Sequence, residues 1–227
     1  MANRLELLVG EQKAFAADAS HQLRTPLTAL QLRIERLRDK IKATKATEQS
    51  FDEIESEISR MRRLIEGLLA LGRASSESLN RETVDAAHVV NQRVEEWASL
   101  AEEAGITLTC ATPRTALALA VPTAIEQIVD NFIDNAISIL SGGGRINVDV
   151  TDQISHVVIS VTDDGPGISA ADANRAFDRF WRGNATHEGT GLGLAIVRQL
   201  AQASGGSVSL TPGESGGTVA RVTLEKP

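Results

Sequence analysis

Apolar residues in the first third of the chain recur at alternating intervals of four and three positions. The first run consists of Leu23, Leu27, Leu30, Ile34, Leu37 and Ile41. The second run consists of Ile54, Ile58, Met61, Ile65 and Leu68. This heptad spacing is typical of helices that pack against other helices. It predicts two long helices, the first from about residue 3 to residue 43, with a turn in KATKAT, which lacks large apolar residues.

A short loop between two helices predicts an antiparallel helical hairpin. Two helices packed against each other leave part of their apolar seam exposed to water. Pairing with a second copy would complete a four-helix bundle, so the pattern predicts a homodimer. The alternative is that the hairpin buries its seam against the downstream part of the chain.

The periodicity changes after the polar segment SSESLNRET, residues 75–83. Helical patterns near 87–104 and 124–140 alternate with strand patterns near 106–110, 116–121, 145–150, 157–161, 207–210 and 219–224. This alternation predicts an α/β layer whose late strands pair antiparallel. The predicted fold class is α+β: a helical hairpin in residues 1–76, a linker in 77–83 and an α/β domain in 84–227.

Composition narrows the classes of function. The formal net charge of −7 over 227 residues argues against a nucleic-acid-binding surface. Cys110 is the single cysteine, which excludes an intrachain disulfide, and its β-like apolar surroundings predict a buried structural thiol. No apolar run has the length of a membrane span. We expect a cytoplasmic piece of a longer sensor, attached to a membrane only through segments outside this sequence, because the start enters a helical pattern without a capping signal.

One histidine in the first predicted helix is not required by packing. His21 lies within FAADASHQLRTPL and shares a face with Thr25. Extended backwards from Leu23, the apolar seam reaches Ser20, so His21 lies one position past a seam position. Pro26 removes a backbone donor and predicts a local kink one turn after the histidine. A lone histidine on such a helix is ordinarily a solvated surface residue, but a neutral imidazole is also a good nucleophile near neutral pH.

Two polar motifs of the second segment suit a nucleotide. QIVDNFIDNA places Asn131 and Asn135 one helical turn apart on a common face, where amide oxygens can coordinate Mg²⁺ beside phosphates. In VTDDGPGIS, Asp163 ends a strand and can accept a hydrogen bond from an adenine amino group. Gly165 and Gly167 allow the backbone to approach a flat ligand. Taken singly, these motifs also fit a solvated helix face and a plain Asp-Gly turn.

A glycine-rich segment, GTGLGLAIVRQLA, begins at Gly189. Gly189, Gly191 and Gly193 precede a predicted helix whose amide groups and positive dipole end suit phosphate oxygens. A dinucleotide-binding site is the rival interpretation. Its fingerprint directly follows a strand, however, whereas these glycines follow a polar loop late in the chain.

The segment AFDRFWRG, residues 176–183, precedes the glycines. Phe177 and Phe180 are candidate anchors, and Arg182 is the candidate phosphate contact, although an arginine in a loop is usually solvated. Residues 178–188 would form a short lid over the nucleotide.

In their order along the chain, these motifs resemble those of the sensor histidine kinases of bacterial two-component systems. SHQLRTPL is similar to the phospho-acceptor box of that family, QIVDNFIDNA to its N-box and AFDRFWRG to its F-box. The D-x-G-x-G and G-x-G-x-G motifs complete the set. The resemblance extends from about residue 5 to residue 224. It implies a dimerising helical hairpin followed by a GHKL (Bergerat) ATP-binding α/β sandwich.

The resemblance also implies roles for individual residues. His21 would take a phosphoryl group from Mg²⁺–ATP and pass it to an aspartate of a response-regulator receiver domain. Thr25 would position water for the opposite, phosphatase reaction, and Asn135 would hold Mg²⁺. The implied nucleotide contacts are Asn131, Asn135, Asp163, Gly165, Gly167, Arg182, Gly189, Thr190, Gly191, Leu192 and Gly193.

Three residues depart from the family pattern. Gln22 stands where an acidic residue usually takes the proton from the far ring nitrogen of the histidine, and an amide can orient the ring but cannot act as that base. Ser138 and Ile139 replace a basic residue that contacts phosphate and an aromatic residue that contacts the nucleotide. We therefore expect a working but slower kinase.

Two other classes of function remain as rivals. One is a kinase-silent, phosphatase-biased regulator that binds ATP to set its conformation. The other is a non-enzymatic dimerisation module whose α/β half is structural, which an absence of ATP binding would support. A chaperone-like or gyrase-like ATPase would leave the acceptor box without a role.

Overall fold

The computed structural model describes residues 33, 34, 36–38, 47, 51, 54, 81–140, 142–178, 181, 191–213 and 216–227. The chain divides into two compact units, Met1–Ser76 and Glu77–Pro227. The nucleotide motifs all belong to the second unit.

The second unit is built on a five-stranded sheet with the strand order β2-β4-β5-β7-β6. β2 pairs in parallel with β4, and the other neighbouring strands pair antiparallel, as the short connections between the late strands predict. The strands are β2 (Ile106–Ala111), β4 (Gly144–Asp152), β5 (His156–Asp163), β6 (Ser207–Pro212) and β7 (Thr218–Glu225).

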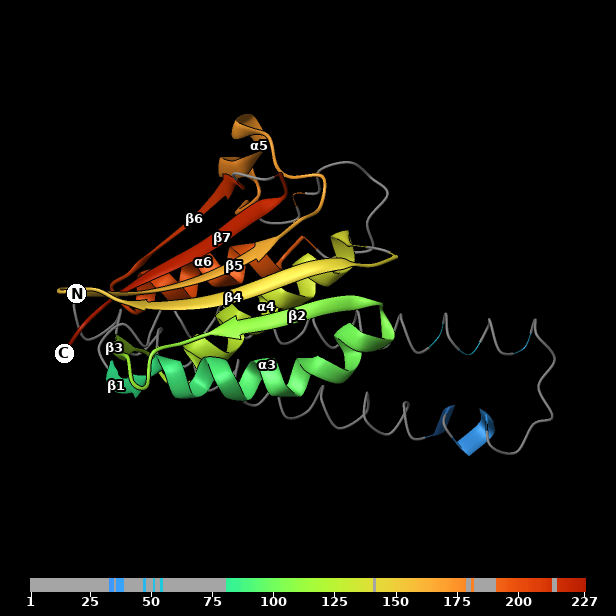
Figure 1. Ribbon diagram of the computed structural model, residues 1–227, viewed down its shortest axis with the longest axis horizontal. Helices are drawn as coiled ribbons and strands as arrows, with labels where there is room; N and C mark the ends of the chain where they lie inside the picture. Colours follow the sequence, from blue (N-terminus) through green and yellow to red (C-terminus); the bar gives the residue numbers. More distant parts are fainter. Residues whose placement is uncertain are drawn as a thin grey trace, which may run out of the picture. The chain divides into compact units, whose positions relative to one another are not determined.

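The core of the second unit lies between one face of this sheet and its helices. Alternate residues of β5 are buried, namely Val157, Ile159, Val161 and Asp163. Helices α4 (Ala124–Ile139) and α6 (Gly193–Ala203) pack against this side of the sheet, and α3 (Ala86–Glu103) packs against β2 and α4 (Figure 1). The buried side of α4 is formed at helical spacing by Ile125, Ile128, Val129, Phe132, Ile133 and Ala136.

A second, two-stranded antiparallel sheet pairs β1 (Glu82–Asp85) with β3 (Leu117–Ala120). Asp85 Oδ1 accepts hydrogen bonds from the backbone N–H of Ala87 at 3.1 Å and of Ala116 at 3.0 Å. One carboxylate therefore caps the start of α3 and ties it to the segment that enters β3.

Arg81, the first described residue of the second unit, is anchored far along the chain. Its Nη1 donates to the carbonyl oxygen of Ser204 at 3.2 Å and pairs with Glu225 Oε2 at 2.7 Å. Gly205 lies against this guanidinium with φ +75°, and a Cβ at that position would collide with Arg81 Nη1. The glycine thus provides the space that the arginine fills.

Some sequence-based expectations differ from the structure in detail. β1 begins at Glu82, inside residues 77–83 that were expected to be linker, and helix α5 (Ala170–Arg175) was not expected. The domain boundaries themselves stay a prediction. Cys110 is half-buried rather than buried, and its Sγ lies 3.5 Å from Asn91 Oδ1. Partial burial, together with the Asp149 carboxylate, raises the pKa of this thiol.

In the first unit, the described seam residues differ in exposure. Ile34 is 9% exposed, whereas Leu37 and Ile54 are 50% and 45% exposed, and Phe51, three positions before Ile54, is 8% exposed. Thr47 is helical, although it ends the KATKAT segment that was expected to form the turn. The apolar seam of this unit is therefore covered in part and open in part at the described positions.

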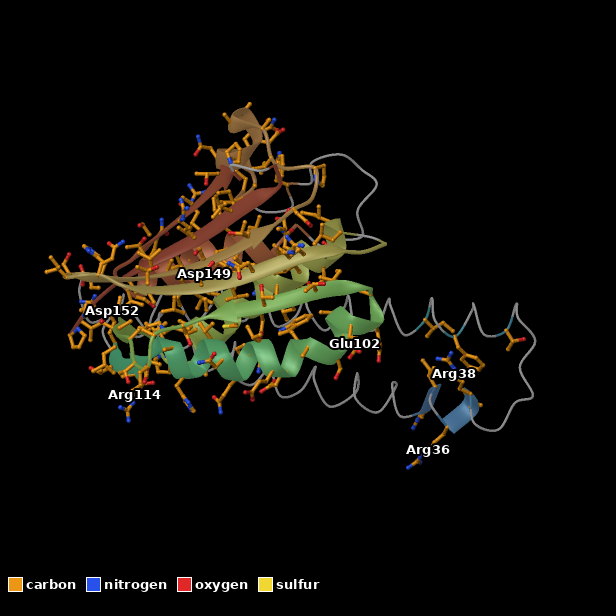
Figure 2. The ribbon with its side chains drawn as sticks, viewed as in Figure 1. Arg36, Arg38, Glu102, Arg114, Asp149 and Asp152 are labelled. Carbon is orange, nitrogen blue, oxygen red and sulfur yellow. The ribbon has the colours of Figure 1, made fainter. Side chains whose placement is uncertain are left out.

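The two ends of the second unit are marked by charged side chains (Figure 2). Arg114 and Asp152 lie at one end, and Glu102 lies at the other, where α3 finishes. Strand β5 and helix α4 also finish at this second end, in Asp163 and Ile139 (Figure 1). The predicted nucleotide residues of β5 and α4 therefore approach the same end of the sheet.

Candidate functional site

Asp163 is the last residue of β5, and its side chain is 6% exposed. Its Oδ1 accepts hydrogen bonds from the backbone N–H of Gly165 at 2.9 Å and of Thr218 at 3.2 Å. Both of these bonds end on the same oxygen. The other oxygen, Oδ2, is the acceptor that this carboxylate can present to a ligand.

Burial raises the pKa of the Asp163 carboxyl above its ordinary value. The two backbone N–H groups that bind Oδ1 lower it, and the neighbouring Asp164 raises it further. The net direction is upward. A desolvated carboxylate of this kind binds a hydrogen-bond donor more strongly than a solvated one, since water no longer competes.

Glycines bring the turn between β6 and β7 against the D-x-G-x-G motif. Gly167 has φ +80°, and a Cβ there would come 2.9 Å from the carbonyl oxygen of Gly217. Gly217 has φ +75°, and a Cβ there would collide with the carbonyl oxygen of Asp163. No other residue type fits these positions, so backbone lies against backbone beside the Asp163 carboxylate.

Gly165 lies against the end of helix α4. A Cβ at Gly165 would come 3.1 Å from Ile139 Cγ2 and 3.3 Å from Leu140 Cδ2. The buried carboxylate therefore has apolar side chains close by, which is the surrounding that a flat heteroaromatic ring with one polar edge requires. Asp163, Gly165 and Ile139 together fit a nucleobase.

Asn131 connects α4 to the glycine-rich motif. Its Nδ2 donates to the carbonyl oxygen of Gln127 at 2.6 Å, one turn earlier on α4. A Cβ at Gly193 would lie 2.6 Å from Asn131 Oδ1, so this oxygen occupies the space beside the glycine. Asn135 follows on the same flank of α4 and is half-buried. Two motifs that are far apart in sequence thus meet in space.

Helix α6 begins at Gly193, with Leu192 as its N-cap residue. Within the described part of the chain, no side chain caps this helix end. Gly191, immediately before the N-cap residue, has φ +66°, which favours glycine. The amide groups of the first turn and the positive end of the helix dipole are therefore suited to phosphate oxygens next to Asn131.

The described residues thus bring together most of the nucleotide contacts named from the sequence: Asn131, Asn135, Asp163, Gly165, Gly167, Gly191, Leu192 and Gly193. The arrangement combines a buried carboxylate in apolar surroundings with a helix N-terminus that suits an anion and lies beside amide side chains. His21, Gln22, Thr25, Arg182, Gly189 and Thr190 lie outside the described residues, and their roles stay predictions.

Two family models match the chain. The model of the His Kinase A (phospho-acceptor) domain matches residues 11–77, and that of the histidine kinase-, DNA gyrase B- and HSP90-like ATPases matches residues 120–227. The first match contains His21 and the second contains the N-box and glycine motifs. The chain belongs to the sensor histidine kinases.

Relatives and solved structures agree with this assignment. The sensor protein CutS of Streptomyces coelicolor is 32% identical over 99% of this chain and 55% of its own length. The crystal structure of full-length ShkA in complex with AMPPNP is similar with a TM-score of 0.70 and 26% identity, over 93% of this chain and 45% of that one. ThkA in complex with the response regulator TrrA has a TM-score of 0.66 at 22% identity, over 100% of this chain and 64% of that one, and shows the fold alone. The histidine kinase chain spans about half the length of CutS.

The expected GHKL-type sandwich of the histidine kinase is confirmed, and so is the α+β class. Thr218 is a site residue that the sequence motifs did not indicate. Its side chain is 7% exposed, and it contributes a backbone N–H to Asp163. A backbone contact leaves no signature in residue type, so only its position directly after Gly217 could have indicated it.

The structure also describes the two residues at the end of α4 that depart from the family's N-box pattern. Ser138 is exposed, and its Oγ donates to the carbonyl oxygen of Asn135 at 2.8 Å, within the helix. Ile139 lies against Gly165. In this histidine kinase the end of α4 therefore offers an aliphatic surface and a locally bonded hydroxyl at those two positions. Among the described helices, none has the length and apolar character that a bilayer crossing requires.

Proposed function

We propose that this chain is an ATP-dependent protein histidine kinase that autophosphorylates on His21 and passes the phosphoryl group to an aspartate of a response regulator. The observation that carries the proposal is the convergence at one end of the second unit. There a buried Asp163 carboxylate with apolar neighbours, the Asn131 amide and the start of α6, which no described side chain caps, lie in one region. The match of residues 11–77 to the phospho-acceptor domain supports His21 as the group that accepts the phosphoryl group.

ATP fits this region by its chemistry. Oδ2 of Asp163 accepts a hydrogen bond from the 6-amino group of adenine, whereas guanine presents a carbonyl there. Gly165 and Ile139 lie against the base, and the first turn of α6 receives the phosphates. The complex of AMPPNP with ShkA, a protein with 26% identity to this chain, supports binding of a nucleotide.

The side-chain amide oxygens of α4 are suitable ligands for Mg²⁺. Among the described residues, no group of three or more His, Cys, Asp or Glu side chains could hold a metal ion. Neutral oxygens such as those of Asn131 and Asn135 suit a cation that is shared with phosphates, because they add no charge to repel them. When bound, Mg²⁺ would neutralise charge on the phosphate oxygens.

The transfer itself depends on His21. Its neutral imidazole nitrogen attacks the γ-phosphorus of ATP in line, an N–P bond forms, and the bond to the bridging oxygen breaks with ADP leaving. The proton on the far ring nitrogen passes to water, because the amide of Gln22 can orient the ring but cannot accept it. Thr25 positions water for the phosphatase reaction.

A homodimer and a receiver domain are the proposed partners. The exposed seam residues Leu37 and Ile54 leave apolar surface that a second copy would cover. Transfer to a receiver domain is supported by the phospho-acceptor family match and by the fold shared with ThkA, which is seen with its response regulator.

Incubation with γ-labelled Mg²⁺–ATP tests the proposal, with the His21→Ala variant as the control. We expect label on the parent chain only, lost in acid and stable in alkali, as a phosphoramidate is. An Asn135→Ala variant should take little label at the same ATP concentration. Absence of label on a parent chain that binds ATP would contradict the kinase proposal.

A further inference from the structure

Asp130 immediately precedes the first asparagine of the site and bonds to another helix. Its Oδ1 accepts a hydrogen bond from Arg93 Nε at 2.7 Å and another from Trp97 Nε1 at 2.9 Å. Arg93 and Trp97 are four residues apart on α3 and share one face of it. A charged and a neutral donor of one helix thus converge on a single carboxylate oxygen of the next.

This contact is shielded from water to a considerable degree. The side chains of Arg93 and Asp130 are 22% and 31% exposed. The neighbouring Glu96, which pairs with Arg93 Nη1 at 2.5 Å, is 61% exposed. A charge-assisted bond between partly desolvated groups holds a defined geometry better than a surface pair does.

Asp130 and Asn131 lie on opposite flanks of the apolar stripe of α4. Helix α4 packs against α3 on one side and α6 on the other. Asp130 faces α3 through its two hydrogen bonds, and Asn131 faces α6 through its contact with Gly193. A rotation of α4 about its own axis therefore moves both residues together.

The apolar stripe alone defines this rotation poorly, because hydrophobic contacts have no preferred direction. Cα atoms lie about 2.3 Å from a helix axis and an asparagine oxygen roughly 5 Å from it, so a rotation of about 10° displaces that oxygen by roughly 1 Å. A displacement of ~1 Å is enough to weaken a site that depends on alignment. Directional bonds at Asp130 oppose such a rotation.

We propose that Asp130 is a positioning residue for the phosphate and Mg²⁺ end of the nucleotide site. With Arg93 and Trp97 it fixes the rotation of α4, and thereby the placement of Asn131 and Asn135. The inference rests on the proposed ATP-binding function and adds a residue that is not among the nucleotide contacts named from the sequence. The adenine end depends less on this contact, because its Asp163 carboxylate is held by β5 and the β6–β7 turn, and α4 contributes only the apolar surface of Ile139.

The test is calorimetric titration of ATP into the full chain, with Mg²⁺ and separately with EDTA. Asp130→Ala should weaken binding of Mg²⁺–ATP by about tenfold while changing the affinity for metal-free ATP by less than about twofold. Asp130→Asn keeps an acceptor oxygen for both donors and should recover most of the Mg²⁺-dependent affinity. The matched control is Glu96→Gln, which removes the exposed partner of the same arginine and should leave both affinities unchanged.

Equal loss of affinity in the two titrations, or no loss in either, would overturn the inference and leave Asp130 a structural contact only. If circular dichroism shows Asp130→Ala unfolded, Trp97→Phe decides by the same criterion, because it removes one donor and keeps the ring. Failure of the ATP-binding function on which the inference rests is distinguishable from this outcome, since the parent chain itself would then bind no ATP.

Discussion

At the scale of single residues, Asp163 shows how a binding requirement opposes stability. Between the ordinary pKa of an aspartate and the raised value, the folded chain holds a proton that the unfolded chain has released. The free energy of unfolding therefore falls as pH rises through this interval and stays lower above it. The carboxylate is retained where an uncharged residue would be more stable, which is expected of a ligand-binding group.

Asp163→Asn should separate the two effects. Its Oδ1 can still accept from Gly165 and Thr218, which places the NH₂ group where Oδ2 was, facing the adenine amino group. We expect the melting temperature at pH 7 to equal or exceed that of the parent, while the affinity for ATP falls about tenfold through two opposed donors. Thermal scans at pH 4 to 8 beside ATP titration measure both. A lower melting temperature at pH 7 would contradict this account of the carboxylate.

Gln22 gives the second prediction at this scale. Gln22→Glu supplies a base for the far ring nitrogen of His21, so the initial rate of autophosphorylation should rise about tenfold at saturating ATP. The affinity for ATP should not change, because residue 22 belongs to the first unit. Rate measurements on the parent and variant decide the matter, and an unchanged rate would mean that the amide does not limit the reaction.

The sequence predicts the site residues whose role depends on residue type, and it does not predict those whose role depends on backbone or packing contacts. Asn131, Asp163 and the glycines were predicted as site residues because their residue types and spacing suit a nucleotide. Thr218 was missed because it acts on Asp163 through its backbone. Asp130 was missed as well, since only the packing of α4 on α3 gives it partners.

At the scale of elements, the long amphipathic helices of the second unit matched their predicted positions, whereas two short elements, β1 and α5, were not predicted. α4 was expected at 124–140 and is Ala124–Ile139, because its apolar periodicity spans several turns. β1 has four residues with two exposed, and α5 has the sequence AADANR, which contains no large apolar residue. Neither is long enough for a period to emerge, so tertiary pairing decides them.

The start of α4 carries a backbone strain that can be relieved. Thr123, its N-cap residue, has φ +61° and is β-branched, a combination that costs about 1–2 kcal/mol. Thr123→Gly removes the cost and sacrifices only the exposed bond from Gln127 Nε2. We expect the free energy of unfolding to rise by about 1 kcal/mol and the melting temperature by roughly 2–4 °C. Thr123→Val keeps the branching and lacks the hydroxyl, so it should be no more stable than the parent.

At the scale of the whole molecule, the exposed seam residues of the first unit support the proposed homodimer. Leu37→Asp and Ile54→Asp place charge on positions that are exposed in one chain and would be buried in a pair. Each should shift sedimentation from dimer towards monomer at micromolar concentration. The exposed Arg221 on β7 provides the control, since Arg221→Asp alters charge in the second unit and should leave the sedimentation unchanged. A parent chain that sediments as a monomer would contradict the dimer proposal.

The anchoring of Arg81 to Ser204 and Glu225 fixes a point of the second unit close to its boundary with the first. Only residues 77–80 separate the first unit from this fixed point. Fully extended, four residues reach at most about 14 Å. Under the proposed function, so short a tether limits which His21 the ATP-binding unit can reach, that of its own chain or that of a second copy. Lengthening the tether should therefore loosen this choice before it impairs nucleotide binding.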